Sequence, residues 1–262
     1  LSAAIAVFVS TLCSGASSSQ ATTTAAQPPF VLEEATIASI HAAFVSETLT
    51  CQQLVESYIA RIEAYDDAGP SLNAILTLNP SALNLAAAMD TRRVSDPTGM
   101  EPLHCIPVIL KDNYDTASLP TTGGSMVMAE SIPLDNAFVV ERLVAAGALI
   151  LAKANLTELA RGGTTVSSLG GQTKNPYAPS RTPGGSSGGT GAAIAANFGA
   201  VGTGSDTGQS IRSPASAGSL VGIRPTRGLI SRDGIIPLSA TQDAAGPITR
   251  TVEDAARMLD AM

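Results

Sequence analysis

The sequence predicts an α/β fold in which strands and helices alternate along the chain. Short runs of buried-type residues are followed by segments with helical spacing, and only 14% of the residues are charged while Ala and Gly are abundant. The 262 residues are enough for one sizeable domain with its own core. A net charge of −7 and the absence of basic clusters argue against a nucleic-acid partner.

The elements follow from local signals taken in chain order. Thr50, with Gln53 at the capping-box position, predicts a helix that runs to about Tyr65. The apolar run 106–110 predicts a buried central strand that ends at Lys111. The other predicted elements are strands at 73–78, 149–154 and 200–204, and helices at 81–93, 136–146, 156–161, 191–198, 211–220 and 251–262.

The N-terminal residues 1–19 are expected to be the remnant of a secretory leader. An apolar stretch followed by small residues is typical of a signal peptide and its cleavage site, and it is too short to span a bilayer. A disordered Ala/Ser-rich tail is the alternative. Residues 20–33 are predicted to be a linker, and residues 34–262 form the folded domain. The protein is therefore expected to be secreted, with a cytoplasmic location as the alternative.

Three residues lie in contexts that suit chemistry better than packing, namely Lys111, Ser186 and Ser210. Lys111 ends the apolar strand, and both serines lie in Gly-rich segments. A lysine and two serines can form a nucleophile and its base without any histidine. Taken singly, they have ordinary alternatives: a salt-bridged lysine, a flexible Gly/Ser linker and an N-cap serine.

The segments that carry these residues resemble the signature blocks of the amidase signature family of serine hydrolases. The blocks are 106–113, 182–189 and 205–214, in the family's order, and the three residues are separated by 75 and 24 positions as in the family. Weaker resemblance extends over about 49–262. It implies a mixed central β-sheet covered by helices on both faces, and a domain that continues past residue 262, so this chain is expected to be its N-terminal part.

The resemblance implies a role for each of the three residues. Ser210 is the expected nucleophile, Ser186 is the expected proton relay, preceded by a cis peptide bond, and Lys111 is the expected base. Lys111 must lose its proton to act, so burial has to lower its pKa by several units.

A supporting set of residues surrounds the expected nucleophile. Asp206 is expected to hold the turn by accepting backbone N–H groups, and Arg212 is expected to support it. Gln209 stands where the family more often has Gly, which is compatible with an N–H donor if its φ is ordinary. The backbone N–H groups expected to bind the oxyanion belong to Thr207, Gly208, Gln209 and Ser210.

The implied function is hydrolysis of a carboxylic amide in a small-molecule substrate through an acyl-enzyme. No cofactor is expected, and two histidines and three cysteines offer no metal-ligand spacing. Two alternatives stay open: a protein like the A-type component of a glutamyl-tRNA amidotransferase, and an inactive truncated remnant. Neither the substrate nor the oligomeric state follows from the sequence, and no membrane span is expected.

Several residues are interpreted as structural. Cys51 and Cys105 are expected to be free buried thiols, because nothing in the sequence brings them together. His104 is expected to pack beside the strand. Asn155 begins a glycosylation sequon that is expected to be buried. The pattern 184–188 also fits a nucleophile elbow, but it lacks a preceding strand and a following histidine.

Overall fold

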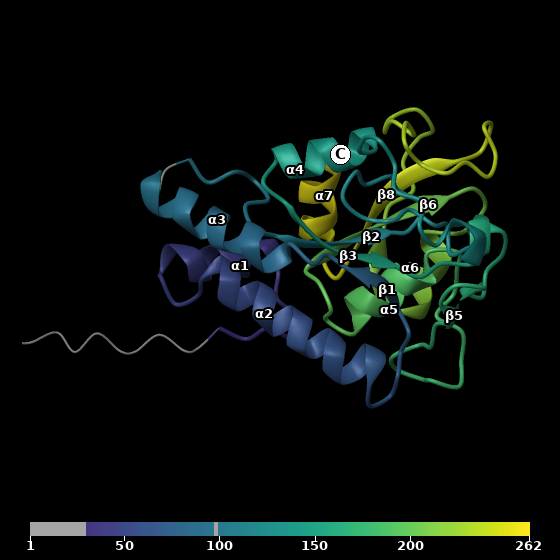
Figure 1. The fold of residues 1–262 in the computed structure, drawn as a ribbon, viewed down its shortest axis with the longest axis horizontal. Helices are drawn as coiled ribbons and strands as arrows, with labels where there is room; N and C mark the ends of the chain where they lie inside the picture. Colours follow the sequence, from purple (N-terminus) through teal and green to yellow (C-terminus); the bar gives the residue numbers. More distant parts are fainter. Residues whose placement is uncertain (1–29, 97–98) are drawn as a thin grey trace, which may run out of the picture.

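The computed structural model describes residues 30–96 and 99–262, built around a six-stranded sheet (Figure 1). Its strands are β1 (Ile75–Leu78), β2 (Pro107–Lys111), β3 (Leu149–Ala154), β6 (Val201–Asp206), β7 (Val221–Gly222) and β8 (Ala244–Thr249). Their spatial order is β1-β3-β2-β6-β8-β7. Strand β2 pairs in parallel with β3 and β6, and the other neighbours pair antiparallel, so the sheet is mixed as expected.

Seven α-helices are found in the described ranges. They are α1 (Ile37–Val45), α2 (Cys51–Ile62), α3 (Ala82–Ser95), α4 (Phe138–Ala145), α5 (Gly188–Ala195), α6 (Arg212–Ala217) and α7 (Val252–Ala261). A π-helical turn (Glu63–Asp67) continues α2, and 3₁₀ turns occur at Met126–Met128 and Glu158–Ala160. A separate small sheet joins β4 (Val166–Ser167) to β5 (Gly171–Gln172). The α/β prediction is therefore confirmed.

Local signals placed most elements correctly. The capping box of Thr50 and Gln53 opens α2, and β3 has the predicted bounds. The predicted helix at 156–161 is wrong, because only a 3₁₀ turn forms there. Leu159 and Ala160 take φ values of 48° and 59°, which a continuous right-handed helix does not permit.

Two elements have no counterpart in the predictions. Helix α1 begins at its own capping box, formed by Thr36 and Ser39, and buries an apolar face on the core. Strand β8 carries Gly246 and Pro247 in its middle, residues that disfavour strands. All six residues of β8 are nevertheless buried, because the strand lies between β6 and β7.

The centre of the sheet is dry and closely packed. Every residue of β2, β3 and β6 is buried. Helix α5 is buried along its whole length and packs against β2 and β6. A Cβ atom at Gly189 in its first turn would lie 2.1 Å from the carbonyl oxygen of Asn155, so only glycine permits this approach. Helices α4 and α7 contact each other in a different part of the molecule (Figure 1).

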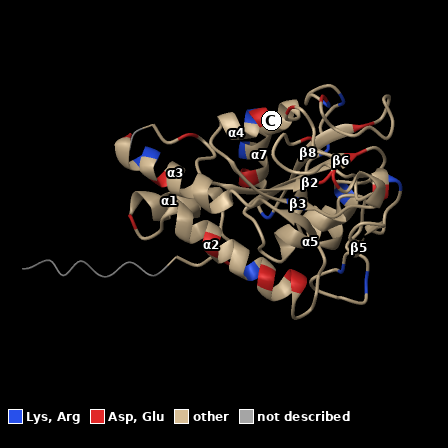
Figure 2. Cartoon of the chain, in the orientation of Figure 1, with Lys and Arg blue, Asp and Glu red and all other residues tan. Residues whose placement is uncertain are grey.

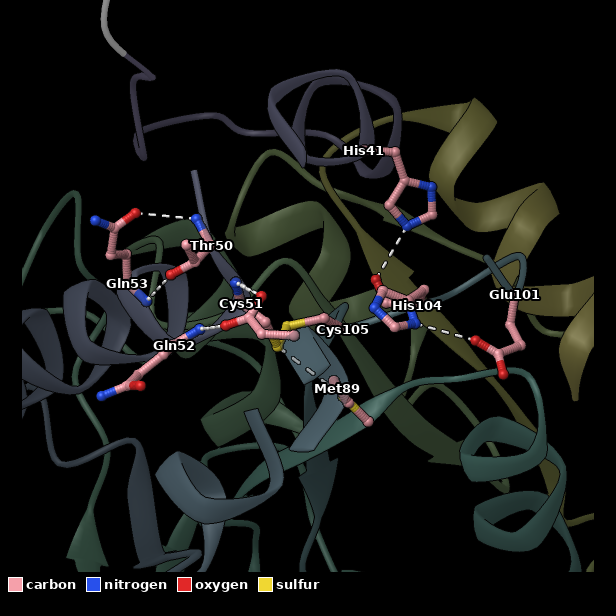
Figure 3. The surroundings of a disulfide bond; sticks show 10 residues. His41, Thr50, Cys51, Gln52, Gln53, Met89, Glu101, His104 and Cys105 are labelled. Atoms are coloured by element: carbon pink, nitrogen blue, oxygen red, sulfur yellow. Dashed lines mark hydrogen bonds and ion pairs between the residues drawn. A yellow bond between two sulfur atoms is a disulfide. The ribbon is translucent and has the colours of Figure 1, made fainter. Parts of the chain in front are cut away.

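Cys51 and Cys105 form a disulfide, so the expectation of free thiols is wrong (Figure 3). Their Cα atoms are 5.9 Å apart although 54 positions separate them in sequence. Folding places the first residue of α2 against the segment that enters β2, and this long-range contact has no local sequence signal. The neighbouring His104 is buried with its Nδ1 3.0 Å from a carboxylate oxygen of Glu101, which fits its expected structural role.

Charge is spread over the described surface rather than concentrated on one element (Figure 2). No described helix is long and apolar enough to cross a membrane. The predicted leader at 1–19 and most of the predicted linker at 20–33 lie outside the described residues, and both stay predictions.

Candidate functional site

Lys111 ends β2 with its side chain wholly buried. Its Nζ lies 2.7 Å from Ser186 Oγ, 2.8 Å from Ser205 Oγ and 3.3 Å from the carbonyl oxygen of Ser205. These three neighbours are uncharged, and Lys111 forms no ion pair with any described carboxylate. The amine is thus removed from water without a direct counter-ion.

This environment moves the proton affinity of Lys111 toward neutrality. Burial lowers its pKa to about 7, while the negative charges of Asp206 and Asp243 act in the opposite direction. The desolvation cost of the ammonium form outweighs both carboxylates, because neither comes within ion-pair distance. The amine can therefore accept a proton near pH 7.

Ser186 is held by its backbone neighbours. The peptide bond from Gly185 to Ser186 is cis, as the resemblance implied. The carbonyl oxygen of Ser186 accepts the N–H of Thr157 at 3.0 Å, and the hydroxyl of Thr165 donates to the carbonyl of Gly184 at 2.7 Å. Ser186 is fully buried, so its hydroxyl is directed at Lys111 from a fixed backbone.

Ser210 lies in the turn between β6 and α6, close to this pair. Its carbonyl oxygen accepts the N–H of Ser187 at 3.2 Å, which ties the turn to the segment carrying Ser186. Within the described residues, Ser210 Oγ makes no hydrogen bond to Ser186 Oγ. The structure therefore joins Lys111 to Ser186 directly and brings Ser210 beside them through the backbone.

The turn before Ser210 presents free backbone donors. In the described part of the chain, the N–H groups of Gly208, Gln209 and Ser210 donate to no other residue. The φ of Gln209 is not positive, as expected. A Cβ atom at Gly208 would meet no atom within 4 Å, so no protein contact requires glycine there, contrary to the idea that this glycine makes room for the turn.

Asp206 anchors the turn from below. Its carboxylate is fully buried and accepts the N–H of Ile211 at 3.1 Å and the Nε of Arg212 at 3.1 Å. Arg224 Nε lies 3.4 Å from its other oxygen. Burial raises the pKa of Asp206, but the hydrogen bonds from Arg212 and Ile211 outweigh it, so the net shift is downward and the group stays ionised.

Two further residues at this site were not found in the sequence. Ser205 contacts Lys111 through both its hydroxyl and its carbonyl, and Asn113 donates its side-chain N–H to Ser205 Oγ at 3.0 Å. Strands β2 and β6 are parallel neighbours, so the residues at their carboxyl ends meet at one edge of the sheet. That pairing, had it been assumed, pointed to Ser205 and to the residues after Lys111.

A cavity of about 460 Å³ opens next to these residues. Ser205 and Thr207 form one end of it, and its other walls include Ile235, Ile236 and Leu238. The cavity therefore adjoins the turn that carries Ser210, and most of its lining side chains are aliphatic.

Two of the expected absences concern the neighbourhood of the site. No cluster of three or more metal-ligand side chains is present among residues 30–96 and 99–262. Asn155 is fully buried, and its Nδ2 lies 3.1 Å from Thr173 Oγ1 and 3.2 Å from the carbonyl of Gly171. The sequon of Asn155 is therefore inaccessible in the folded protein.

Comparison with known proteins gives matches along most of the chain. The family described as Amidase matches residues 53–262. A probable amidase of Arabidopsis thaliana is 44% identical over 240 residues, covering 89% of this chain and 46% of that protein. The A-type component of the glutamyl-tRNA(Gln) amidotransferase of Alkaliphilus metalliredigens is 42% identical over 232 residues, covering 88% of this chain and 46% of that protein.

The solved structures agree with these sequence matches. Native peptide amidase from Stenotrophomonas maltophilia superposes with a TM-score of 0.85 at 44% identity, covering 89% of this chain and 49% of that chain. The chain spans about half the length of the relatives it matches. The family match covers most of the chain and the folds superpose closely, so the chain belongs to the amidase family.

Proposed function

We propose that this chain carries the reaction centre of an enzyme that hydrolyses carboxylic amides. The observation that carries the proposal is the contact between the fully buried amine of Lys111 and the hydroxyl of Ser186, at 2.7 Å. A neutral amine in this position can take a proton from a serine hydroxyl, which a charged lysine cannot do.

In the proposed reaction, Ser210 Oγ attacks the amide carbon while its proton passes to Ser186 and the proton of Ser186 passes to Lys111. The negative charge on the carbonyl oxygen is bound by backbone N–H groups of the turn 207–210. Collapse of this intermediate breaks the C–N bond, and the leaving amine receives a proton back through Ser186. Water then attacks the acyl-Ser210 ester by the same route and releases the carboxylic acid.

The substrate group that acylates Ser210 is proposed to lie in the cavity beside Thr207. The aliphatic side chains of Ile235, Ile236 and Leu238 favour an apolar group there. The peptide amidase likeness makes amino-acid and peptide amides the first compounds to test.

An assay of ammonia release from blocked amino-acid amides tests this proposal. We expect release by the full chain and none by Ser210→Ala. If both proteins are inactive while Ser210 also stays unreactive toward an active-serine reagent, the chain is the inactive remnant and the proposal is wrong.

A second candidate is suggested by the relatives that are components of glutamyl-tRNA(Gln) amidotransferases. Such a component would share the amide-cleaving step, but the released ammonia would pass to an acceptor. Glutamine would then be the preferred amide, so comparing glutamine with blocked amides in the same assay separates the two functions.

A further inference from the structure

A second lysine is buried in the same sheet, and the proposed reaction does not use it. Lys153 lies in β3, is fully buried and pairs in register with Leu110 of β2. Side chains that pair across neighbouring strands share a face, while successive side chains alternate. The side chain of Lys153 therefore leaves the sheet on the face opposite to that of Lys111.

Lys153 is surrounded by polar partners from one turn. Its Nζ lies 3.1 Å from a carboxylate oxygen of Asp112, and it donates to the carbonyl of Pro120 and the hydroxyl of Thr121, each at 2.9 Å. It also donates to Thr116 Oγ1 at 3.2 Å. The ammonium group of Lys153 thus ties both ends of the turn 112–121 to β3.

The other oxygen of Asp112 closes the same turn. It accepts the backbone N–H of Thr122 at 3.1 Å and also the hydroxyl of Thr122. Asp112 directly follows Lys111, and the next residue, Asn113, donates to Ser205 Oγ. The turn fastened by Lys153 therefore leads straight out of the site and includes one of the groups that contact it.

The two buried lysines differ in one respect that decides their charge. Lys153 has the carboxylate of Asp112 at ion-pair distance, whereas Lys111 contacts only hydroxyl and carbonyl oxygens. A buried ammonium is costly without a counter-charge and is retained with one.

We propose that Lys153 is a positioning residue of the site, which Asp112 keeps positively charged so that it fastens the turn behind Lys111. The chain thereby assigns one buried lysine to structure and leaves the other free to exchange its proton. Its importance for activity rests on the proposed function, but the division between the two lysines does not.

The charged groups around each lysine are few. Besides Asp112, the carboxylate of Asp115 acts on Lys153 from a longer distance. Asp206 and Asp243 act on Lys111. Burial lowers the pKa of Lys153 and the two carboxylates near it raise it, with Asp112 the larger of the two.

The chain is well suited to a direct test, because it has three lysines. The third, Lys174, donates to the carbonyl of Pro70 at an exposed position and serves as an internal reference. Lysine labelled with ¹³C at Cε gives one NMR signal per residue, assigned by Lys174→Arg and by the variants below. In the wild-type chain we expect Lys111 to titrate first and Lys153 to keep its proton to a clearly higher pH.

Asp112→Asn removes the counter-ion with little change of shape. We expect the titration midpoint of Lys153 to fall by about 1–3 pH units, which is the usual effect of one adjacent opposite charge. Asp115→Asn is the matched control and should produce a smaller fall. An unchanged midpoint in Asp112→Asn overturns the proposal. So does a wild-type chain in which Lys153 loses its proton together with Lys111 or before it, and this outcome does not depend on the variant folding.

The reaction of Ser210 with a fluorophosphonate tests the link to activity on the same samples. Ser210 Oγ forms a bond to phosphorus, fluoride leaves, and the serine proton passes to the base. We expect Lys153→Met to slow labelling about tenfold or more at a pH where Lys111 is neutral, whereas Lys174→Met leaves the rate unchanged. Equal rates in both variants overturn the positioning role. If no protein is labelled while the lysines titrate as expected, the proposed function is wrong and the division between the two lysines stands.

Discussion

The Nζ of Lys111 lies 2.7 Å from the Oγ of Ser186, and both side chains are fully buried. A lysine in such surroundings usually has a carboxylate partner, and Lys153 on the neighbouring strand shows that arrangement. Lys111 lacks one among the described residues, so burial acts on its proton without direct compensation. This difference is the physical basis for regarding Lys111 as the base.

Replacement of the proposed nucleophile should remove the reaction. Ser210→Ala is expected to lower ammonia release by about 10³-fold or more, because no other hydroxyl is placed to form the acyl ester. Ser216→Ala, at an exposed position in α6, is the matched control and should keep full activity. Substantial turnover by Ser210→Ala, measured with purified protein, means that another residue attacks the amide.

Activity should fall on acidification through the pKa of Lys111. The amine must be neutral to accept a proton, so with a pKa of about 7 the rate should be constant above that pH. Below it, the rate should drop by about tenfold for each pH unit. A rate profile for ammonia release between pH 5 and pH 9 measures this, and a rate that does not change between those limits contradicts the role of Lys111.

The same group makes folding stability depend on pH. The pKa of Lys111 is about 7 in the folded chain, below the ordinary lysine value near 10.4 that applies when it is unfolded. Between these two values the unfolded chain binds more protons, so the contribution of Lys111 to stability increases as pH rises. Urea unfolding should show a smaller difference between pH 7 and pH 9 for Lys111→Met than for wild type. Equal differences in the two proteins mean that Lys111 is not desolvated.

Ser205 should affect the proton affinity of Lys111 as well as the rate. Its hydroxyl and carbonyl both accept hydrogen bonds from the amine, and an accepted bond stabilises the ammonium form. We expect Ser205→Ala to shift the pH profile of activity to lower pH and to reduce the plateau rate, because the amine loses one of the contacts that orient it. A profile with an unchanged midpoint shows that the contact of Ser205 Oγ has no effect on the base.

Loss of the disulfide should destabilise the chain without touching the site. Closing a loop of 54 residues between Cys51 and Cys105 restricts the unfolded state, which is worth about 4 kcal/mol. We expect Cys51→Ala combined with Cys105→Ala to lower the free energy of unfolding by about this amount in urea titrations. A loss below about 1 kcal/mol contradicts a structural role for the bond.

The disulfide also bears on where the protein is made. Disulfides persist in oxidising compartments, so its presence favours the predicted secretion over a cytoplasmic location. Secretion stays a prediction, and determining the N-terminal residue of the protein isolated from its source tests it. A terminus following the apolar segment 1–12 supports secretion, and retention of that segment in a cytoplasmic fraction contradicts it.

Local patterns in the sequence predicted the elements on which the site is built. The apolar run before Lys111 gave β2, and the glycines around Ser186 were correctly interpreted as part of a packed core, because α5 begins within them. The positions of Lys111, Ser186 and Ser210 in one region followed from the family resemblance, and could not be obtained from periodicity.

The features that the sequence did not predict all depend on contacts between distant segments. The disulfide joins residues 54 positions apart, and Ser205 meets Lys111 only because β6 pairs with β2. Strand β8 has a poor strand composition and is stabilised by its two neighbours in the sheet. The ion pair of Lys153 with Asp112 likewise requires the order β3-β2, which no local pattern reveals.

The most direct test of the central claim is the reaction of Ser210 with a fluorophosphonate in wild type and in Lys111→Met, followed by mass analysis of the labelled peptide. We expect one adduct at Ser210 in the wild-type chain at pH 8, and about 10³-fold slower labelling in Lys111→Met, whose side chain fills the same space but cannot accept a proton. Equal labelling of Ser210 in the two proteins would show that the serine is activated without Lys111.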